Sequence, residues 1–264
     1  MIPADFQHAL DLLDAGDAAG LAAHLAAHPG LARQRVDYAD EGYFRSPALL
    51  DFVAENPARR GQLPPAIVDV ATAILEAGAW EDPAIVNSAL GLVASGRVAR
   101  ESGVQTALID LLCDRGADPN CALLPALAHG EFAAAQALVR RGAAATLAYS
   151  AATGRADDAR ALLEAASADE RHTALALAAQ HGHAAIVALL LDAGEDPNRF
   201  NPPGAHAHAT PLHQAAGAGH EAVVRLLAER GARLDMIDAQ YGGTPRGWAQ
   251  YAGHEAVAAY LSER

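Results

Sequence analysis

Short blocks of apolar residues, spaced three and four positions apart and separated by glycines, recur along most of the chain. This pattern is typical of short amphipathic helices. The clearest example is the stretch 210–232. Thr210 is a favourable N-cap residue and Pro211 suits the first helical position, where its missing N–H costs no hydrogen bond, so a helix is predicted to begin there. Gly219 is expected to end this helix, and Gly231 to end the helix that follows.

The second helix of this stretch carries its apolar side chains on one face, and they are Val223, Val224, Leu226 and Leu227. Neither helix is long enough to be stable alone in water. The pair therefore has to bury its apolar side against further copies of itself, which predicts a repeat architecture.

The residues of this stretch resemble the ankyrin repeat, whose pattern reads T-P-L-H-x-A-A, then G-H, then V-V-x-x-L-L-x-x-G-A. The resemblance implies an all-α solenoid of about seven to eight helix-turn-helix units with degenerate caps at both ends. It also implies a scaffold with a concave recognition surface. It does not identify an activity, because function has to be argued from a site.

We expect one ankyrin array over residues 1–264, with no second domain. Its parts are an N-terminal capping unit at 1–31, repeats over 46–231 and a C-terminal capping unit at 244–264. With the caps included, the pattern predicts eight helix pairs, of which the third should begin near Asn87 and the sixth at Thr173.

The connectors between units differ in length, and in ankyrin arrays the connecting hairpins, or fingers, form much of the recognition face. The connectors long enough for fingers are 32–45, 194–210 and 231–244, whereas 116–121 and 142–145 are too short. We therefore expect fingers at both ends of the array and short or missing fingers in the middle. Insertions within the second and third units are expected near residues 56–65 and 97–104.

Composition agrees with thin helices packed through small side chains, since 52% of the residues are hydrophobic but only 5% are aromatic. The net charge is −13, from 19 Lys plus Arg against 32 Asp plus Glu. Such a charge repels phosphate backbones and anionic lipids. We therefore expect neither nucleic acid nor a membrane as a partner.

Two further features bear on the compartment. Cys113 and Cys121 cannot form a disulfide framework, which favours a reducing environment. Residues 1–13 carry Asp5 and Asp11 and no long apolar run, so we expect neither a signal peptide nor a membrane span. A cytoplasmic protein is expected, and we take it to be a monomer.

The segment 32–45 mixes acidic with aromatic residues, a composition common at recognition surfaces. The candidate partner-binding residues of this end, including two from the next connector, are Tyr38, Asp40, Glu41, Tyr43, Arg45, Trp80 and Glu81. A second interpretation is equally open. In it the segment packs its aromatic side chains over the first two units while its charged side chains stay in solvent.

At the other end of the array the candidate partner-binding residues are Phe200, His206, His208 and Tyr241. In an extended segment the rings of His206 and His208 would lie on one side, an arrangement that suits a divalent metal if a third ligand is supplied. No nearby Cys or H-x-x-x-H completes such a set. No metal site is therefore predicted, and a finger that contacts solvent or a partner is the preferred interpretation.

Several histidines of the repeats are interpreted as structural. His213 stands at the histidine position of T-P-L-H, and the family resemblance implies that its ring hydrogen-bonds between neighbouring repeats. His183, His220 and His254 each follow the glycine that separates the two helices of a unit. The resemblance therefore assigns them to repeat packing.

Local catalytic motifs are missing from the sequence. It contains no Gly-rich phosphate loop, no G-x-S-x-G elbow, no H-E-x-x-H and no C-x-x-C. Cys113 falls at a mostly buried helical position, which favours an inert thiol. No catalytic residue and no cofactor are predicted.

The leading hypothesis is a non-catalytic module that binds a protein partner, one with a basic segment, through the concave and acidic finger face. The alternative is a small-molecule binding protein or an enzyme with a pocket between the loop 32–45 and the finger 199–209. Such a pocket would bring together several of Asp37, Asp40, Glu41, Arg45, Asp51 and His206.

Overall fold

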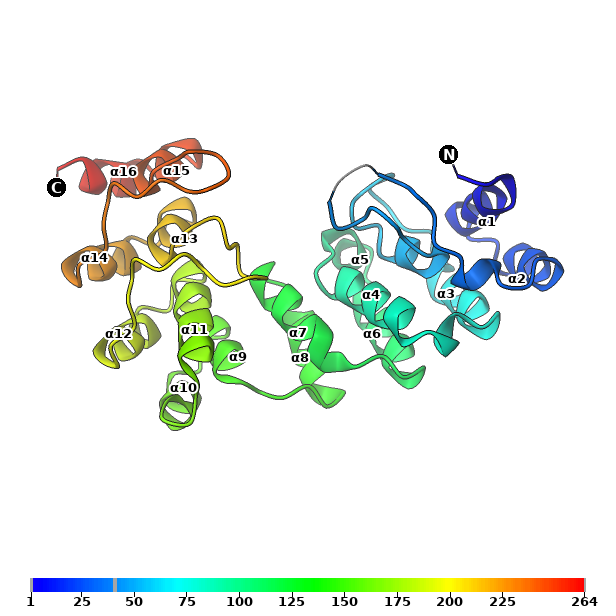
Figure 1. The fold of residues 1–264 in the computed structure, drawn as a ribbon, viewed down its shortest axis with the longest axis horizontal. Helices are drawn as coiled ribbons and strands as arrows, with labels where there is room; N and C mark the ends of the chain where they lie inside the picture. Colours follow the sequence, from blue (N-terminus) through cyan, green and yellow to red (C-terminus); the bar gives the residue numbers. More distant parts are fainter. Residues whose placement is uncertain (1, 40–41, 264) are drawn as a thin grey trace. The chain divides into compact units, whose positions relative to one another are not determined.

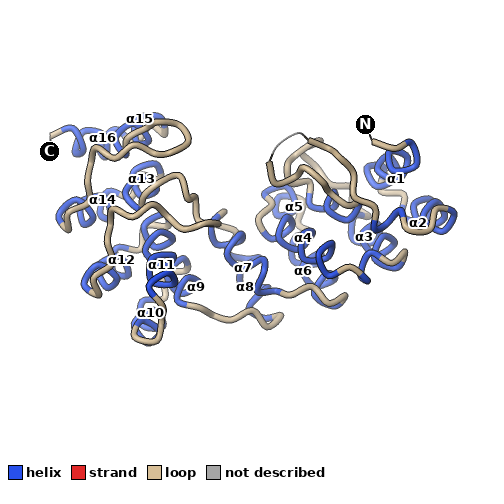
Figure 2. Tube along the Cα trace, viewed as in Figure 1, coloured by secondary structure: helices blue, strands red, loops and turns tan. Residues whose placement is uncertain are grey.

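The structure, a computed structural model, describes residues 2–39 and 42–263. Within these ranges the regular elements are short α-helices and 3-10 helices joined by loops, and Figure 2 shows no strand among them. An isolated β-bridge joins Arg35 and Ala48. None of the helices in this part of the chain combines the length and the apolar run that a membrane span needs.

The contacts divide the chain into two compact units, residues 1–144 and 145–264, and each is described by itself. The helices of the first unit form pairs in chain order, which Figure 1 shows beside one another. The pairs are α1 (Ala4–Ala15) with α2 (Ala18–Ala27), η2 (Leu49–Ala54) with α3 (Ile67–Glu76), α4 (Pro83–Ala94) with α6 (Gln105–Asp114), and α7 (Pro119–Ala128) with α8 (Phe132–Arg140). Three shorter helices are η1 (Leu31–Arg33), η3 (Ala79–Glu81) and α5 (Arg97–Glu101).

Successive pairs of the first unit stack on one another through like helices. The first helices contact in the order α1, η2, α4 and α7, and the second helices in the order α2, α3, α6 and α8. Each pair therefore buries its apolar side against its neighbours, as short helices require.

The second unit repeats this arrangement with four further pairs (Figure 1). They are α9 (Leu147–Ala152) with α10 (Ala156–Leu163), α11 (Ala168–Gln180) with α12 (Ala184–Asp192), α13 (Pro211–Gly217) with α14 (Glu221–Glu229), and α15 (Pro245–Tyr251) with α16 (Glu255–Ser262). The first helices again contact in order, α9, α11, α13 and α15. Alanines that are fully buried lie on each of these four helices, and they include Ala151, Ala174, Ala178, Ala215 and Ala249. Small side chains therefore allow neighbouring helices to approach closely.

The predicted fold class is confirmed, since the described residues form stacked helix pairs and the eight expected pairs are all present. The short connectors in the middle are also confirmed. Only residues 115–118 separate α6 from α7, and only residues 141–146 separate α8 from α9. The single array over 1–264, with capping units at 1–31 and 244–264, stays a prediction, because contacts are grouped within two units.

Two predicted starting points are wrong. The third pair begins at Pro83 and not near Asn87, because the Asp82 side chain accepts the Ala84 N–H (2.9 Å) and so caps the helix. The sixth pair begins at Ala168 and not at Thr173. There Ser167 and Glu170 form a capping box, with the Glu170 N–H donating to Ser167 Oγ (3.2 Å) and the Ser167 N–H donating to Glu170 Oε2 (2.8 Å). In both cases a local capping signal starts the helix earlier than the repeat pattern suggests.

Contacts between glycines and histidines join neighbouring repeats of the second unit. In each contact a glycine in the left-handed region lies against the histidine ring of the following repeat, and the pairs are Gly154 with His183, Gly182 with His220 and Gly219 with His254. The His220 Nε2 also lies 3.0 Å from the Gln180 carbonyl oxygen. The expected packing role of these three histidines is thus confirmed.

Substitution of Gly182 by alanine should destabilise the second unit more than substitution of Gly194. Both glycines have positive φ (81° and 90°), so either alanine should cost about 1 kcal/mol in backbone strain. A Cβ at Gly182 would in addition lie 2.7 Å from His220 Nδ1, whereas a Cβ at Gly194 would meet nothing within 4 Å. Overpacking of this kind costs a further 1–3 kcal/mol or so, about the range seen in tight cores. Urea unfolding of both variants measures how much unfolding free energy each substitution removes. Equal losses of unfolding free energy would show that the His220 contact does not contribute to stability.

Candidate functional site

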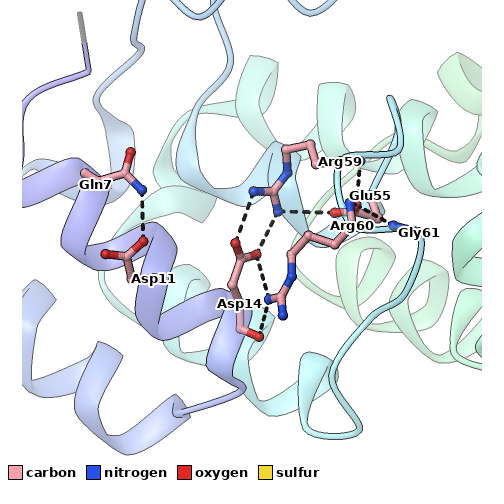
Figure 3. A network of polar contacts seen from close by, with 7 residues as sticks. All are labelled: Gln7, Asp11, Asp14, Glu55, Arg59, Arg60 and Gly61. Carbon is pink, nitrogen blue, oxygen red and sulfur yellow. Dashed lines mark hydrogen bonds and ion pairs between the residues drawn. The ribbon is translucent and has the colours of Figure 1, made fainter.

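The insertion after η2 is held by a buried carboxylate. Glu55 is 2% exposed and adopts the left-handed region (φ 48°), and its Oε1 accepts the N–H groups of Arg59 (2.6 Å), Arg60 and Gly61 (3.2 Å). Figure 3 shows the Arg59 guanidinium between Glu55 and Asp14, with Nη2 at 3.2 Å from Glu55 Oε2 and 2.8 Å from Asp14 Oδ1. The insertion is therefore tied to α1, which carries Asp14.

The finger of the first unit folds back over η2. Its two sides pair through the Val36 N–H and the Pro47 carbonyl (3.1 Å), and through the Tyr38 N–H and the Arg45 carbonyl (3.0 Å). Phe44, at the same finger, is buried.

An aromatic cluster lies beneath this finger. The Phe52 ring lies edge-on to those of Tyr38 (5.2 Å), Phe44 (5.1 Å) and Phe6 (6.0 Å), with distances between ring centroids. The structure therefore places the half-buried Tyr38 against two buried rings, those of Phe44 and Phe52. Tyr43 lies differently, since it is 72% exposed and its hydroxyl donates to Asn56 Oδ1 (3.0 Å).

Three other predicted residues of the first unit, Arg45, Trp80 and Glu81, lie at its surface. Arg45 is exposed, and Glu81 forms an ion pair with Arg33. Trp80 lies in η3 and is 52% exposed. Asp40 and Glu41 lie outside the described residues.

Asp51, which the enzyme hypothesis used, lies in the interior of the first unit. It is 1% exposed, and its Oδ2 accepts the Ala48 N–H (2.8 Å). Burial raises the pKa of Asp51, against the opposing effects of Ser88, Ala48 and Arg35. The side chain caps η2 and does not face solvent beside Asp37, which is exposed.

The structure contradicts the extended conformation expected at His206 and His208. His206 has a φ of 62°, and the Ala209 N–H donates to its carbonyl oxygen (3.0 Å), so the segment turns at this point. The turn follows Gly204, which also has positive φ (84°). The two rings nevertheless lie close together, perpendicular to each other at 6.1 Å between centroids.

Four rings gather in the second unit, three from its fingers and one from α15, and we call them the ring cluster: His206, His208, Tyr241 and Trp248. The His208 centroid lies 5.6 Å from that of Tyr241 and 5.7 Å from that of Trp248. Tyr241 is 72% exposed, and the other three are half-buried. The structure thus brings together three predicted residues from two different connectors. Phe200, the fourth predicted residue of this end, is 40% exposed.

The place of Trp248 beside His208 was not predicted from sequence. Its indole N–H donates to Asp238 Oδ2 (3.0 Å), which fixes the ring against the last connector. The sequence gives no signal for this contact, because only the fold brings the finger 199–209 beside the connector 231–244.

The last connector is itself held by Asp238, which is 3% exposed. Its carboxylate accepts the N–H groups of Gln240 (2.9 Å), Tyr241 (2.6 Å) and Gly243 (2.7 Å). Burial alone would raise the pKa of Asp238, but these hydrogen bonds and that from Trp248 outweigh it, so its pKa lies well below the ordinary value. The carboxylate therefore stays ionised and the connector keeps one conformation.

Two buried histidines tie the first helices to the fingers. His172 Nε2 lies 3.0 Å from the Phe200 carbonyl oxygen, and His213 Nε2 lies 3.1 Å from the Gly243 carbonyl oxygen. Both side chains are 0% exposed, and burial lowers the pKa of both. Neutral rings therefore donate to these carbonyls. The structural role of His213 is confirmed, whereas the same role of His172 was missed from sequence.

Metal-binding and thiol chemistry find little support in the described residues. No group of three or more His, Cys, Asp or Glu side chains in residues 2–39 and 42–263 is placed to hold a metal ion. Burial raises the pKa of the Cys113 thiol, and it raises that of the Cys121 thiol to about 11. Both thiols are therefore protonated at neutral pH and are poor nucleophiles.

One groove of the first unit, of about 740 Å³, lies between the ends of α3 and α6, and we call it the Trp80 groove. Its lining residues are Glu76, Trp80, Pro83, Val86, Asp114, Arg115 and Gly116. It includes one of the candidate residues predicted from sequence.

A comparison with protein-family models matches residues 170–202 and 208–239 to the model described as Ankyrin repeat. The two matches cover α11 and α13 with their partner helices α12 and α14, and they include the finger 199–209 in part. No curated protein matches the chain.

Removal of the His213 imidazole should weaken the dependence of stability on pH. Because burial lowers the pKa of His213, the unfolded chain takes up this proton more readily than the folded protein. The stabilisation is therefore fully present above the unfolded pKa of about 6.5 and is lost as the pH falls through the lower folded pKa. Measured by urea unfolding, the free energy of unfolding should fall less between about pH 7.5 and pH 5.5 for His213→Gln than for the wild type.

The matched control for this experiment is His129→Gln, which removes an exposed imidazole. It should keep the pH dependence of the wild type. If His213→Gln and His129→Gln follow the same pH dependence, the neutral His213 ring does not contribute as described.

Proposed function

Because this chain is an ankyrin-repeat protein, we propose that it is a non-catalytic module that binds a protein partner through its fingers. Ankyrin repeats generally mediate protein–protein interactions. The observation that supports the proposal most is the ring cluster, where His208 and Tyr241 from two connectors meet Trp248 of α15. Tyrosine and tryptophan side chains are enriched at protein interfaces, where they supply large contact areas.

The connectors that carry the ring cluster are fixed before any partner binds. The Ala239 N–H donates to the His208 carbonyl oxygen (2.8 Å), which joins the finger 199–209 to the connector 231–244. The Tyr241 N–H donates to Asp238 Oδ1 (2.6 Å), which fixes the backbone at Tyr241. A preformed surface of this kind loses little conformational entropy on binding, which favours affinity.

We further propose a partner with a basic segment, because the net charge of −13 attracts cations and should speed association at low salt. The proposed contact residues of the first unit are Tyr38, Asp40, Glu41, Tyr43, Arg45, Trp80 and Glu81. Those of the second unit are Phe200, His206, His208 and Tyr241. The large exposure of Tyr43 (72%) and Trp80 (52%) supports their inclusion.

The proposed setting is the cytoplasm, with the chain acting as a monomer. Cys113 and Cys121 are both free thiols, which agrees with a reducing compartment.

The proposal is tested by capture of partners from an extract of cells that naturally contain the protein. Carbodiimide joins carboxylates to lysine amines, and this chain has no lysine, since all of its 19 basic residues are arginines. Apart from a terminal amine, the reagent therefore cannot cross-link the chain to itself through amines. A covalent adduct reports a partner lysine that lies next to an acidic residue of this chain.

The double variant Tyr241→Ala, His208→Ala should recover at least about tenfold less of the captured partner than the wild type, as expected when two contact residues are lost. The control is Tyr251→Ala, because Tyr251 is 98% exposed and lies outside the ring cluster. Urea unfolding checks that both variants remain folded. Equal recovery by the wild type and the folded double variant would refute partner binding through the ring cluster.

A further inference from the structure

We propose that the Trp80 groove of the first unit receives a basic side chain, arginine or lysine, from the bound partner. This inference rests on the proposed function and specifies what the first unit recognises. The groove offers an exposed aromatic ring, two carboxylates and two helix ends of negative polarity within one concave site.

The aromatic wall of the groove is Trp80, which is 52% exposed although the chain has few large aromatic residues. It lies in η3, directly after α3, and Pro83 and Val86 from the start of α4 line the groove with it. A cation over an indole face is attracted by its quadrupole, and tryptophan is the strongest such partner among the side chains. The volume of about 740 Å³ is ample for one long basic side chain.

The charge of the groove also favours a cation. Glu76 is the last residue of α3 and Asp114 the last residue of α6, and each helix has 10 residues. A helix C-terminus carries partial negative charge, so each carboxylate adds to the field of its own helix end. Against these groups stand two arginines, Arg115 of the lining and Arg141, which pairs with Asp114.

The two carboxylates of the groove already form ion pairs with arginines, but these ion pairs are exposed and weak. Arg115 Nη2 lies 3.6 Å from Glu76 Oε1, and the Glu76 side chain is 66% exposed. Asp114, which is 63% exposed, pairs with Arg141. Exposed ion pairs of this kind contribute little, about 0–1 kcal/mol, so an incoming cation can share or replace them. Arg115 further shows that a guanidinium fits beside Glu76.

Other classes of side chain fit the groove less well. An acidic side chain would meet Glu76 and Asp114, and like charges repel. An apolar side chain would remove water from the exposed charges of these ion pairs without adding a polar contact, which costs desolvation energy. A basic side chain avoids both penalties and stacks its apolar stem or guanidinium plane on Trp80.

The test uses the indole N–H signals of the ¹⁵N-labelled full chain, because the protein has only two tryptophans, Trp80 and Trp248. The Trp80→Phe variant assigns the Trp80 signal. The probe is the peptide acetyl-Gly-Arg-Gly-amide, and the matched control peptide replaces arginine by citrulline, which has nearly the same shape and no charge. A lysine peptide and a glutamate peptide complete the series.

The arginine and lysine peptides should shift the Trp80 signal in a saturable manner, with a weak Kd of about 1–10 mM, as expected for one side chain. The citrulline and glutamate peptides should not. The double variant Glu76→Gln, Asp114→Asn should weaken binding about tenfold or more and leave the urea midpoint nearly unchanged, since both side chains are exposed. Higher salt should weaken peptide binding by the wild type until its affinity approaches that of the double variant.

Three results would overturn the inference: an equal shift with the citrulline peptide, a shift of the Trp248 signal alone, or no shift at peptide concentrations well above this range. Failure here is distinguishable from failure of the proposed function. If the peptides fail while the ring-cluster variant still loses its captured partner, the groove assignment is wrong and partner binding stands. If the peptides bind but the ring-cluster variant captures as the wild type does, the groove assignment is supported and the ring cluster is not the partner site.

Discussion

The burial of one helix pair against the next is the interaction on which the rest of this protein depends. The longest helix in the described residues, α11, has 13 residues, and helices of that length are marginal in water. Stability has to come from contacts between pairs, and fully buried alanines allow these contacts to be close. The connectors are then free to carry recognition, because they contribute less to the core than the helices do.

Hydrogen bonds from the helices determine how rigid those connectors are. His172 and His213 reach from buried positions to carbonyl oxygens at Phe200 and Gly243, and Asp238 holds the last connector through four donors. In the first unit, Glu55 and Arg59 fix the insertion in a comparable way. Each case uses a buried or half-buried polar group that hydrogen-bonds to the exposed segment, which favours one conformation of that segment.

The helix pairs and the short middle connectors were predictable from sequence, because periodic apolar positions and glycines encode them locally. Helix starts were less predictable, since Asp82 and Ser167 supply capping signals that the repeat pattern does not contain. The candidate site was predictable only in part. The residue types of Tyr241 and His208 indicated it, but their meeting with Trp248 depends on contacts between distant connectors. The turn at His206 (φ 62°) was likewise not predictable, because histidine does not require a positive φ.

We infer from the hydrogen bonds of the last connector that the ring cluster is held in place before any partner binds. Amide hydrogen exchange of the free protein tests it most directly, at the backbone N–H groups of Ala239, Tyr241 and Gly243, which donate to His208 and Asp238. We expect these three amides to be protected nearly as strongly as the amides within α13. Exchange of these three amides at the rate of an unstructured loop would contradict it.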